Sequence, residues 1–188
     1  MVLCLLPFEE AWFRERSVPA TFIGHPVMAR EFDEDELAQR ASDYPHGAPK
    51  ILLLPGSRSG EVSSNLASLV KVFGELRNRN GRTEGVIVAA NERIAKQIQS
   101  KLSPMPSGLH LSEGDLDTAI HWADLALTVS GTVSLDLTRH ATPMVGIYNV
   151  GVVSWLLSKL VLRAPYRLLP NIVANDEIVP EFVPHLAL

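Results

Sequence analysis

Cysteine is almost absent from this sequence, which contains one, Cys4, in 188 residues. A lone cysteine excludes an internal disulfide framework and a cysteine-rich zinc site, and it favours a reducing compartment. No apolar run reaches the roughly 18 residues that span a bilayer. Positive charge is not in excess either, since 17 basic residues face 21 acidic ones and the formal net charge is −4. This balance argues against a nucleic-acid-binding protein, which normally carries a basic surface to neutralise phosphates.

Several catalytic and phosphate-binding motifs are also missing. The sequence has neither Gly-x-Gly-x-x-Gly nor Gly-Lys-Ser/Thr, which disfavours dinucleotide dehydrogenases and P-loop hydrolases. It lacks the Gly-x-Ser-x-Gly of α/β-hydrolases. The six histidines lack the i, i+4 spacing of a helical zinc site. His25, which precedes a proline at a predicted strand end, is either a site residue or a partly buried polar group.

What the sequence does contain is an alternation of short apolar runs with longer amphipathic stretches. This pattern predicts an α/β fold of the Rossmann-like, doubly wound type, in which helices cover both faces of a parallel sheet. The predicted strands are Val2–Leu6, Ala20–Gly24, Lys50–Leu54, Gly85–Ala89, Leu109–Leu111, Leu125–Val129 and Met144–Tyr148. The predicted helices are Glu9–Arg16, Asp35–Ser42, Glu61–Arg79, Glu92–Leu102, Leu116–Trp122, Val133–His140 and Val152–Leu162, with a further helix beginning near Ile178.

The loop after the strand Lys50–Leu54 is the first candidate for binding chemistry, because ligands of a doubly wound sheet lie beyond the carboxyl ends of its strands. It contains Gly56, Ser57 and Arg58 and leads into a helix near Glu61. Arg58 lies where a guanidinium can clamp phosphate oxygens. The alternative is a capped turn with a solvated arginine.

The second candidate loop, Ser130-Gly131-Thr132, joins another strand to a helix. Backbone N–H groups at a helix start, together with the helix dipole, form an anion site. Asp136, one turn further on, could accept hydrogen bonds from a ribose. In the alternative interpretation Ser130 and Thr132 only cap the helix, and Asp136 favours its positive end. Asn171 follows another apparent strand end, where an asparagine binds a base or sugar edge or holds a turn.

The stretch from Val152 to Leu168 differs in character, because it combines apolar residues with the basic residues Lys159, Arg163 and Arg167. Such a composition is typical of an interfacial helix that contacts acyl chains and anionic head groups. A core helix with a basic outer edge is the alternative.

Together these segments resemble one family, lipid-A-disaccharide synthase, a glycosyltransferase with two Rossmann-like domains (the GT-B type). The resemblance covers nearly the whole chain, and its combination of motifs is specific although each motif alone is not. The matching segments are Leu6-Pro7-Phe8-Glu9, Phe22-Ile23-Gly24-His25, Leu52–Arg58 with Glu61, Ser130-Gly131-Thr132, Pro143-Met144-Val145 with Tyr148, Leu169-Pro170-Asn171-Ile172 and Val179-Pro180-Glu181.

The resemblance implies that the chain is the C-terminal, donor-binding half of such an enzyme, truncated at both ends. Residues 1–32 would then be the end of the N-terminal Rossmann domain and the crossover from it, and residues 33–49 a linker. Residues 50–175 would form the UDP-sugar-binding Rossmann domain, and residues 176–188 the start of the C-terminal helices.

The family transfers 2,3-diacylglucosamine from UDP to 2,3-diacylglucosamine 1-phosphate at the cytoplasmic face of the inner membrane and needs no cofactor or metal. At position 136 the family usually has glutamate, which is one methylene longer than aspartate. The implied UDP-sugar contacts are Gly56, Ser57, Arg58, Glu61, Ser130, Gly131, Thr132, Asp136, Asn171 and Glu181. The implied membrane-facing residues are Trp155, Lys159, Arg163 and Arg167.

The family's catalytic base would lie in the N-terminal domain, so this chain alone is expected to bind UDP weakly or not at all and to be inactive. Two alternatives remain. A UDP-N-acetylglucosamine 2-epimerase has the same architecture but needs acidic and histidine residues around the sugar. The second alternative is a non-catalytic remnant that binds nucleotide and pairs with itself as a homodimer.

Overall fold

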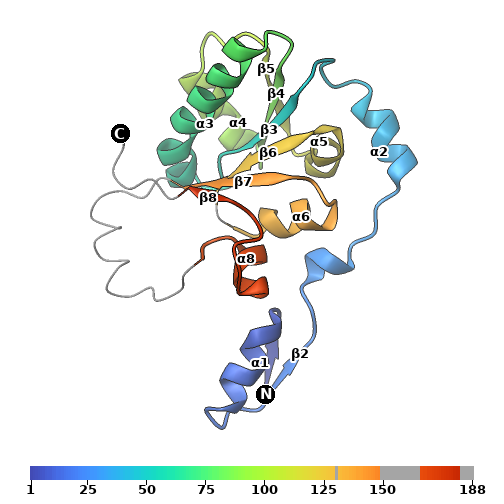
Figure 1. Cartoon of the computed structure of the whole chain (residues 1–188), viewed down its shortest axis with the longest axis vertical. Helices are drawn as coiled ribbons and strands as arrows, with labels where there is room; N and C mark the ends of the chain where they lie inside the picture. Colours follow the sequence, from blue (N-terminus) through green and yellow to red (C-terminus); the bar gives the residue numbers. More distant parts are fainter. Residues whose placement is uncertain (130, 149–165, 183–188) are drawn as a thin grey trace.

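The computed structural model describes residues 1–129, 131–148 and 166–182 (Figure 1). Within these residues the main body is a six-stranded parallel sheet with the order β5-β4-β3-β6-β7-β8. The predicted doubly wound sheet is therefore confirmed. Its strands are β3 (Lys50–Leu54), β4 (Glu84–Ala89), β5 (Leu109–Glu113), β6 (Leu125–Thr128), β7 (Met144–Ile147) and β8 (Glu181–Phe182).

Among the described residues, two helices cover each face of the sheet. The helices α3 (Ser59–Arg79) and α4 (Glu92–Lys101) pack on one face, while α5 (Leu116–Trp122) and α6 (Val133–Arg139) pack on the other. A further helix, α2 (Glu34–Ala41), lies against α5, and α8 (Leu169–Ala174) lies against α6 (Figure 1). Among the described residues, no helix has both the length and the apolar character needed to cross a bilayer.

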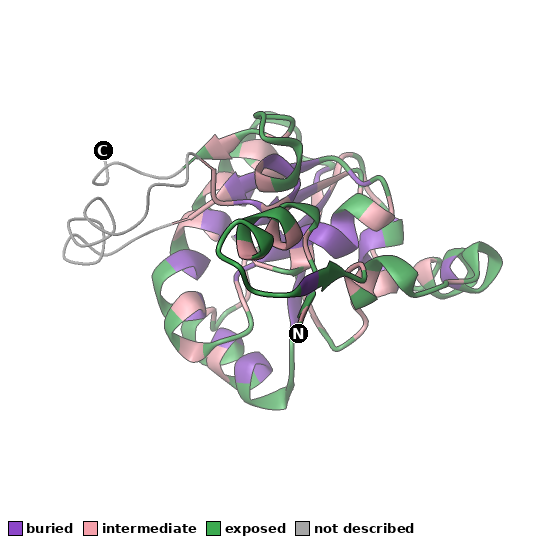
Figure 2. Cartoon of the chain, turned by 90° about the horizontal axis from the view of Figure 1, so that it is seen from below, coloured by how far each residue is buried: buried purple, intermediate pink, exposed green. Residues whose placement is uncertain are grey.

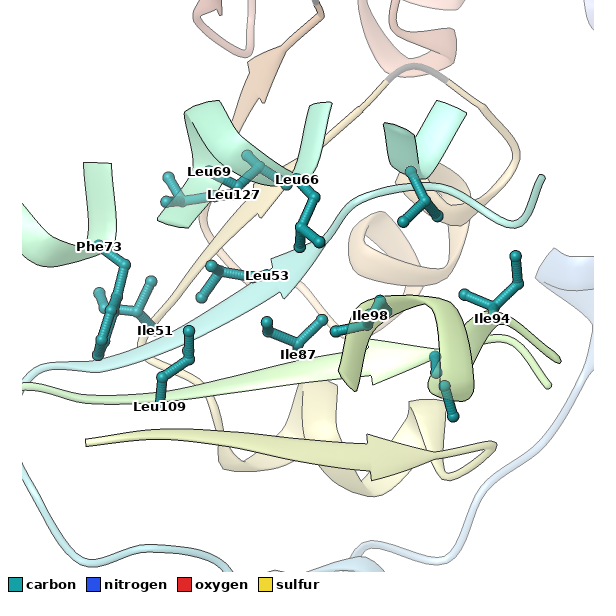
Figure 3. Packing of buried hydrophobic residues seen from close by; sticks show 13 residues of the cluster. Ile51, Leu53, Leu66, Leu69, Phe73, Ile87, Ile94, Ile98, Leu109 and Leu127 are labelled. Atoms are coloured by element: carbon teal, nitrogen blue, oxygen red, sulfur yellow. The ribbon is translucent and has the colours of Figure 1, made fainter. Parts of the chain in front are cut away.

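Strand β3 shows why the core strands read as unbroken apolar runs. Its side chains alternate between the two faces, so that Ile51 and Leu53 join the α3–α4 side whereas Leu52 and Leu54 join the α5–α6 side. Figure 3 shows Leu53 packed among residues of β4, α3 and α4 on the first face. A strand that is buried on both faces has no solvent side on which polar residues are favoured.

The first residues form a small unit of their own. Strands β1 (Val2–Cys4) and β2 (Ala20–Phe22) pair in parallel beside α1 (Pro7–Arg14), separately from the main sheet (Figure 1). Figure 2 shows this unit largely exposed. Its exposed large apolar residues are Met1, Leu3, Leu5, Phe8, Trp12, Val18 and Phe22. Two parallel strands and one helix are too small to cover that apolar surface by themselves.

Residues 23–33, called the strap below, connect this unit to α2. The strap contains a short 3-10 helix, η1 (Pro26–Ala29), which packs against α6 of the main body (Figure 1). His25 caps η1, because its Nδ1 accepts a hydrogen bond from the Val27 backbone N–H at 3.2 Å. This gives His25 a structural contact within the strap.

Two predictions near the end of the chain are wrong. Asn171 lies inside α8 and not after a strand, because Pro170 fits the first turn of a helix, where its missing N–H is not needed. The helix expected from Ile178 onward is contradicted at Glu181–Phe182, which pair with β7 as strand β8. The predicted helix Val152–Leu162 lies outside the described residues, and so do the implied membrane-facing residues Trp155, Lys159 and Arg163.

Candidate functional site

A cavity of about 530 Å³ opens at the carboxyl edge of the sheet, where the chain continues from β3 and from β6. These two strands are neighbours, with β4 and β5 on one side of them and β7 and β8 on the other. They therefore mark the topological switch point, at which a doubly wound sheet leaves a crevice for ligands. The described lining residues are Leu54, Gly56, Ser57, Arg58, Glu61, Val88, Ala89, Ala90, Gly114, Leu116, Val129, Gly131, Thr132, Val133 and Asp136.

Both candidate loops reach this cavity. The first contributes Gly56, Ser57, Arg58 and Glu61, and the second contributes Gly131, Thr132 and Asp136. Ser130 lies outside the described residues. The sequence patterns did not identify the apolar residues that line the cavity, such as Val88 and Leu116. The carboxyl end of strand β4, which lies beside β3, could have indicated Val88.

Glu61 orders the first loop. Its Oε2 accepts hydrogen bonds from the backbone N–H groups of Ser57, at 3.0 Å, and Arg58, at 3.2 Å. Its Oε1 lies 2.7 Å from Nη1 of Arg58. The carboxylate thus caps the first turn of α3 and sits beside the guanidinium. The Arg58 side chain is 81% exposed, so its charge lies at the mouth of the cavity.

Gly56→Ala is expected to lower the free energy of unfolding by about 1–3 kcal/mol. Gly56 has a φ of +111°, and a Cβ there would lie 2.6 Å from Cβ of Glu61 and 2.7 Å from its Oε2. The matched control is Gly60→Ala in the first turn of α3, where a Cβ meets no atom within 4 Å. This control should be neutral or gain about 0.5–1 kcal/mol, because alanine favours the helix. Urea denaturation of both variants measures the difference, and equal effects would contradict the close approach of Glu61.

The second loop presents the first turn of α6 to the cavity. Thr132 is the residue before the helix, but its side chain makes no capping hydrogen bond. Instead, Oγ of Ser134 donates to the carbonyl oxygen of Gly131 at 2.7 Å. Capping of α6 by the Thr132 hydroxyl is therefore wrong. The Ser134 hydroxyl does not replace this cap, because it donates to a carbonyl oxygen and satisfies none of the free backbone N–H groups at the helix start.

Asp136 forms a polar part of the cavity wall and is only 5% exposed. Its Oδ1 accepts a hydrogen bond from Nη1 of Arg30 at 3.1 Å, and Arg30 belongs to the strap. Burial raises the pKa of the Asp136 carboxyl; the Arg30 guanidinium opposes this rise, and the Asp117 carboxylate adds to it. Arg30 is thus the nearby cation that favours the ionised form most.

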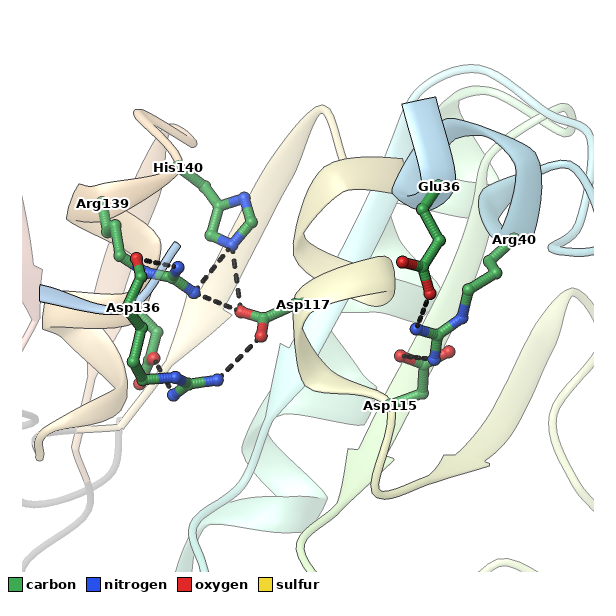
Figure 4. A network of polar contacts seen from close by, with 8 residues as sticks. Glu36, Arg40, Asp115, Asp117, Asp136, Arg139 and His140 are labelled. Carbon is green, nitrogen blue, oxygen red and sulfur yellow. Dashed lines mark hydrogen bonds and ion pairs between the residues drawn. The ribbon is translucent and has the colours of Figure 1, made fainter. Parts of the chain in front are cut away.

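Asp117 of α5 lies near Asp136 and is the centre of a polar cluster (Figure 4). It lies 2.8 Å from Nη2 of Arg30, 2.5 Å from Nη2 of Arg139 and 3.0 Å from Nε2 of His140. Phe32 of the strap stacks on the His140 ring, with centroids 4.1 Å apart. Burial works against ionisation of Asp117, yet the hydrogen bond to His140 and the charges of Arg139 and Arg30 together lower its pKa.

Asn171 and Glu181 meet each other but are not among the described residues that line the cavity. The Asn171 amide donates to the carbonyl oxygen of Val179 and to Oε1 of Glu181, both at 2.7 Å. The Glu181 carboxylate also accepts the backbone N–H groups of Arg167 and Leu168, each at 2.8 Å. These bonds hold β8 against the start of α8, so the side chains of Asn171 and Glu181 both stabilise the fold.

No three His, Cys, Asp or Glu side chains of residues 1–129, 131–148 and 166–182 gather as ligands.

The fold and the cavity define a class: a Rossmann-like domain of the kind that GT-B glycosyltransferases contain. The structure of the E. coli ADP-heptose lipopolysaccharide heptosyltransferase II superposes on 84% of this chain and 45% of its own, with a TM-score of 0.55 and 10% identity. At that identity the likeness concerns the fold alone.

The family described as lipid-A-disaccharide synthetase matches residues 1–186, and the chain belongs to this family. A lipid-A-disaccharide synthase of Granulibacter bethesdensis is 34% identical over 97% of this chain and 47% of its own length. One of Salmonella paratyphi B is 35% identical over 97% of this chain and 49% of its own. The chain therefore spans about half the length of the curated relatives it matches.

Proposed function

We propose that this chain is the UDP-sugar-binding half of a lipid-A-disaccharide synthase. The reaction would transfer 2,3-diacylglucosamine from UDP to 2,3-diacylglucosamine 1-phosphate with release of UDP. The observation that carries the proposal is that both family motifs, Gly56–Arg58 and Gly131-Thr132, meet at one cavity at the switch point of the sheet. Membership of the family supports the same assignment.

The cavity suits a nucleoside diphosphate in size and in the chemistry of its walls. Its volume of about 530 Å³ lies within the range of small-molecule sites. Arg58 at the mouth and the first turn of α6 would face the diphosphate. The buried Asp136 carboxylate would accept hydrogen bonds from the ribose, and the apolar residues Val88 and Leu116 would contact the uracil ring.

On this proposal the chain would stabilise the leaving group of the transfer. Negative charge builds on UDP as the glycosidic bond breaks, and a guanidinium beside the diphosphate lowers the energy of that state. An inverting transfer also needs a base that takes the proton of the attacking hydroxyl. Both carboxylates of the described cavity are paired, Glu61 with Arg58 and Asp136 with Arg30. We therefore assign the base to the part of the relatives that this chain does not span, and we expect no turnover from this chain alone.

Calorimetric titration with UDP tests the proposal. Weak but saturable binding is expected, because both loops reach one formed cavity. Arg58→Ala should weaken it tenfold or more, about 1.4 kcal/mol, because the diphosphate loses a charged partner. The matched control is Arg79→Ala, an exposed arginine at the other end of α3, roughly 30 Å away along a helix of this length. Equal losses of affinity in the two variants would show that the diphosphate does not bind at the first loop. A wild-type chain that binds no UDP would refute the proposal.

The proposal includes a location at the cytoplasmic face of the inner membrane, because both sugar substrates carry acyl chains. The stretch from Val152 to Leu168 is proposed as the contact with lipid, through Trp155, Lys159, Arg163 and Arg167. Of these residues the structure describes Arg167, which is partly buried. A second copy of the chain is the proposed cover for the exposed apolar residues of the β1-α1-β2 unit.

The alternative functions receive less support from the site. An epimerase would need histidines around the sugar, and none is found among the described residues that line the cavity. A nucleotide-binding remnant would share the cavity with the synthase, and the genomic sequence upstream of Met1 separates the two.

A further inference from the structure

We propose that Arg30 is a positioning residue for the nucleotide site, which holds the Asp136 carboxylate in the place and ionised state that a ribose requires. The inference rests on the proposed function, since it takes the cavity as the nucleotide site. It goes beyond that function because Arg30 belongs to the strap and is not among the described residues that line the cavity.

Arg30 is fixed at its backbone and at its side chain. The guanidinium bridges two carboxylates, with Nη1 3.1 Å from Asp136 and Nη2 2.8 Å from Asp117. The carbonyl oxygen of Arg30 accepts a hydrogen bond from Nη1 of Arg139 at 2.9 Å. A planar fork with two separate donors suits such a bridge, and a lysine ammonium would not reproduce it.

Asp136 depends on Arg30 because of where its carboxylate lies. Asp117 of α5 is a second negative charge nearby. Arg139 at the end of α6 and His140 directly after it form their ion pairs with Asp117 and not with Asp136. Arg30 is the described cation that contacts Asp136 directly. Without it, a buried carboxylate beside another carboxylate would take up a proton, and it would then be a poorer acceptor of hydrogen bonds.

The contact leaves room for a ligand. Arg30 engages Oδ1 of Asp136, and among the described residues no hydrogen bond to Oδ2 is found. Since Asp136 lines the cavity, Oδ2 is the atom that would accept a ribose hydroxyl. Arg30 therefore fixes one oxygen of the carboxylate so that the other is presented to the ligand.

Two measurements on Arg30→Met test the proposal. The pKa of Asp136, followed by NMR of its carboxyl carbon in the ligand-free protein, should rise. The affinity for UDP should fall about tenfold, and the deficit relative to the wild type should grow as the pH falls, because the protonated carboxyl accumulates. Any protonation of UDP itself affects the wild type and the variant equally, so it does not contribute to the difference between them. Arg30→Lys should restore part of both properties, since it returns the charge without the fork.

The matched control is Arg40→Met. The Arg40 side chain is 49% exposed, against 50% for Arg30, and lies 2.7 Å from Asp115 immediately before α5 without contacting Asp136 (Figure 4). It should change neither the pKa of Asp136 nor the affinity for UDP. Circular dichroism checks that each variant folds, and Arg30→Gln carries the same expectations if Arg30→Met does not fold.

The outcomes separate this inference from the proposed function. A wild type that binds UDP, together with an Arg30→Met variant of equal affinity or with an unshifted Asp136 pKa, overturns the role of Arg30 and leaves the nucleotide site standing. A wild type that does not bind UDP overturns both. Losses of the same size in Arg30→Met and Arg40→Met also overturn the role, because they would reflect general loosening around α5.

Discussion

Asp117→Asn is expected to lower the free energy of unfolding by about 3–5 kcal/mol at neutral pH. Asp117 is the shared anionic partner of Arg139 and His140, whose side chains are only 6% and 3% exposed. Asparagine keeps the shape but leaves a buried guanidinium without its counter-charge. Urea denaturation measures the loss, and Asp43→Asn, an exposed aspartate after α2, is the control expected to change little.

The same variant has a pH signature. The folded-state pKa of Asp117 is lowered, so its ionised form adds stability at pH values above the ordinary range of an aspartate. That stability is lost as the pH falls through the lowered folded-state pKa. The difference between wild type and Asp117→Asn should therefore be largest near neutral pH and shrink in acid. A difference that does not change with pH would show that the cluster acts by packing alone.

Phe73→Ala is expected to cost about 3–5 kcal/mol of unfolding free energy. Phe73 is 1% exposed and lies between α3 and the sheet (Figure 3). Gly85 of β4 leaves space for the Phe73 ring because it has no side chain. A Cβ at position 85 would lie 2.5 Å from Cε2 of Phe73 and 2.8 Å from Cδ1 of Leu109. Alanine would leave a cavity that this close packing does not fill.

Lys71→Ala on the same helix is the control, since Lys71 is exposed and alanine is at least as good a helix former. Chemical denaturation of both variants decides the matter. A loss below about 1 kcal/mol for Phe73→Ala would contradict the packing between α3 and β4.

Much of the cavity was predictable because it depends on local patterns and one topological rule. The apolar run Lys50–Leu54 indicated a strand buried on both faces, and glycine-rich turns followed it and β6. Carboxyl ends of parallel strands share one edge of a sheet, so two loops in that position meet without any knowledge of the distances between them.

The polar cluster was not predictable in the same way. Arg30 bonds to Asp117 and Asp136, which are 87 and 106 residues further along the chain. No local pattern marks such a pair, and a charged connector is normally solvated. Asn171 was misjudged for a different reason: Leu169-Pro170 was taken as the end of a strand, whereas a proline also fits the first turn of a helix.

The ion pair between Glu61 and Arg58 has a consequence for selectivity among anions. Glu61 is a tethered competitor, present at the guanidinium whenever the cavity is empty. An exposed pair of this kind contributes only about 0–1 kcal/mol, so a ligand loses little by displacing it. Chloride or a single phosphate offers few additional contacts to offset even that loss. Under the proposed function a nucleoside diphosphate would gain contacts along the whole cavity. The pair would then shift selectivity modestly toward the larger ligand, by at most about 1 kcal/mol.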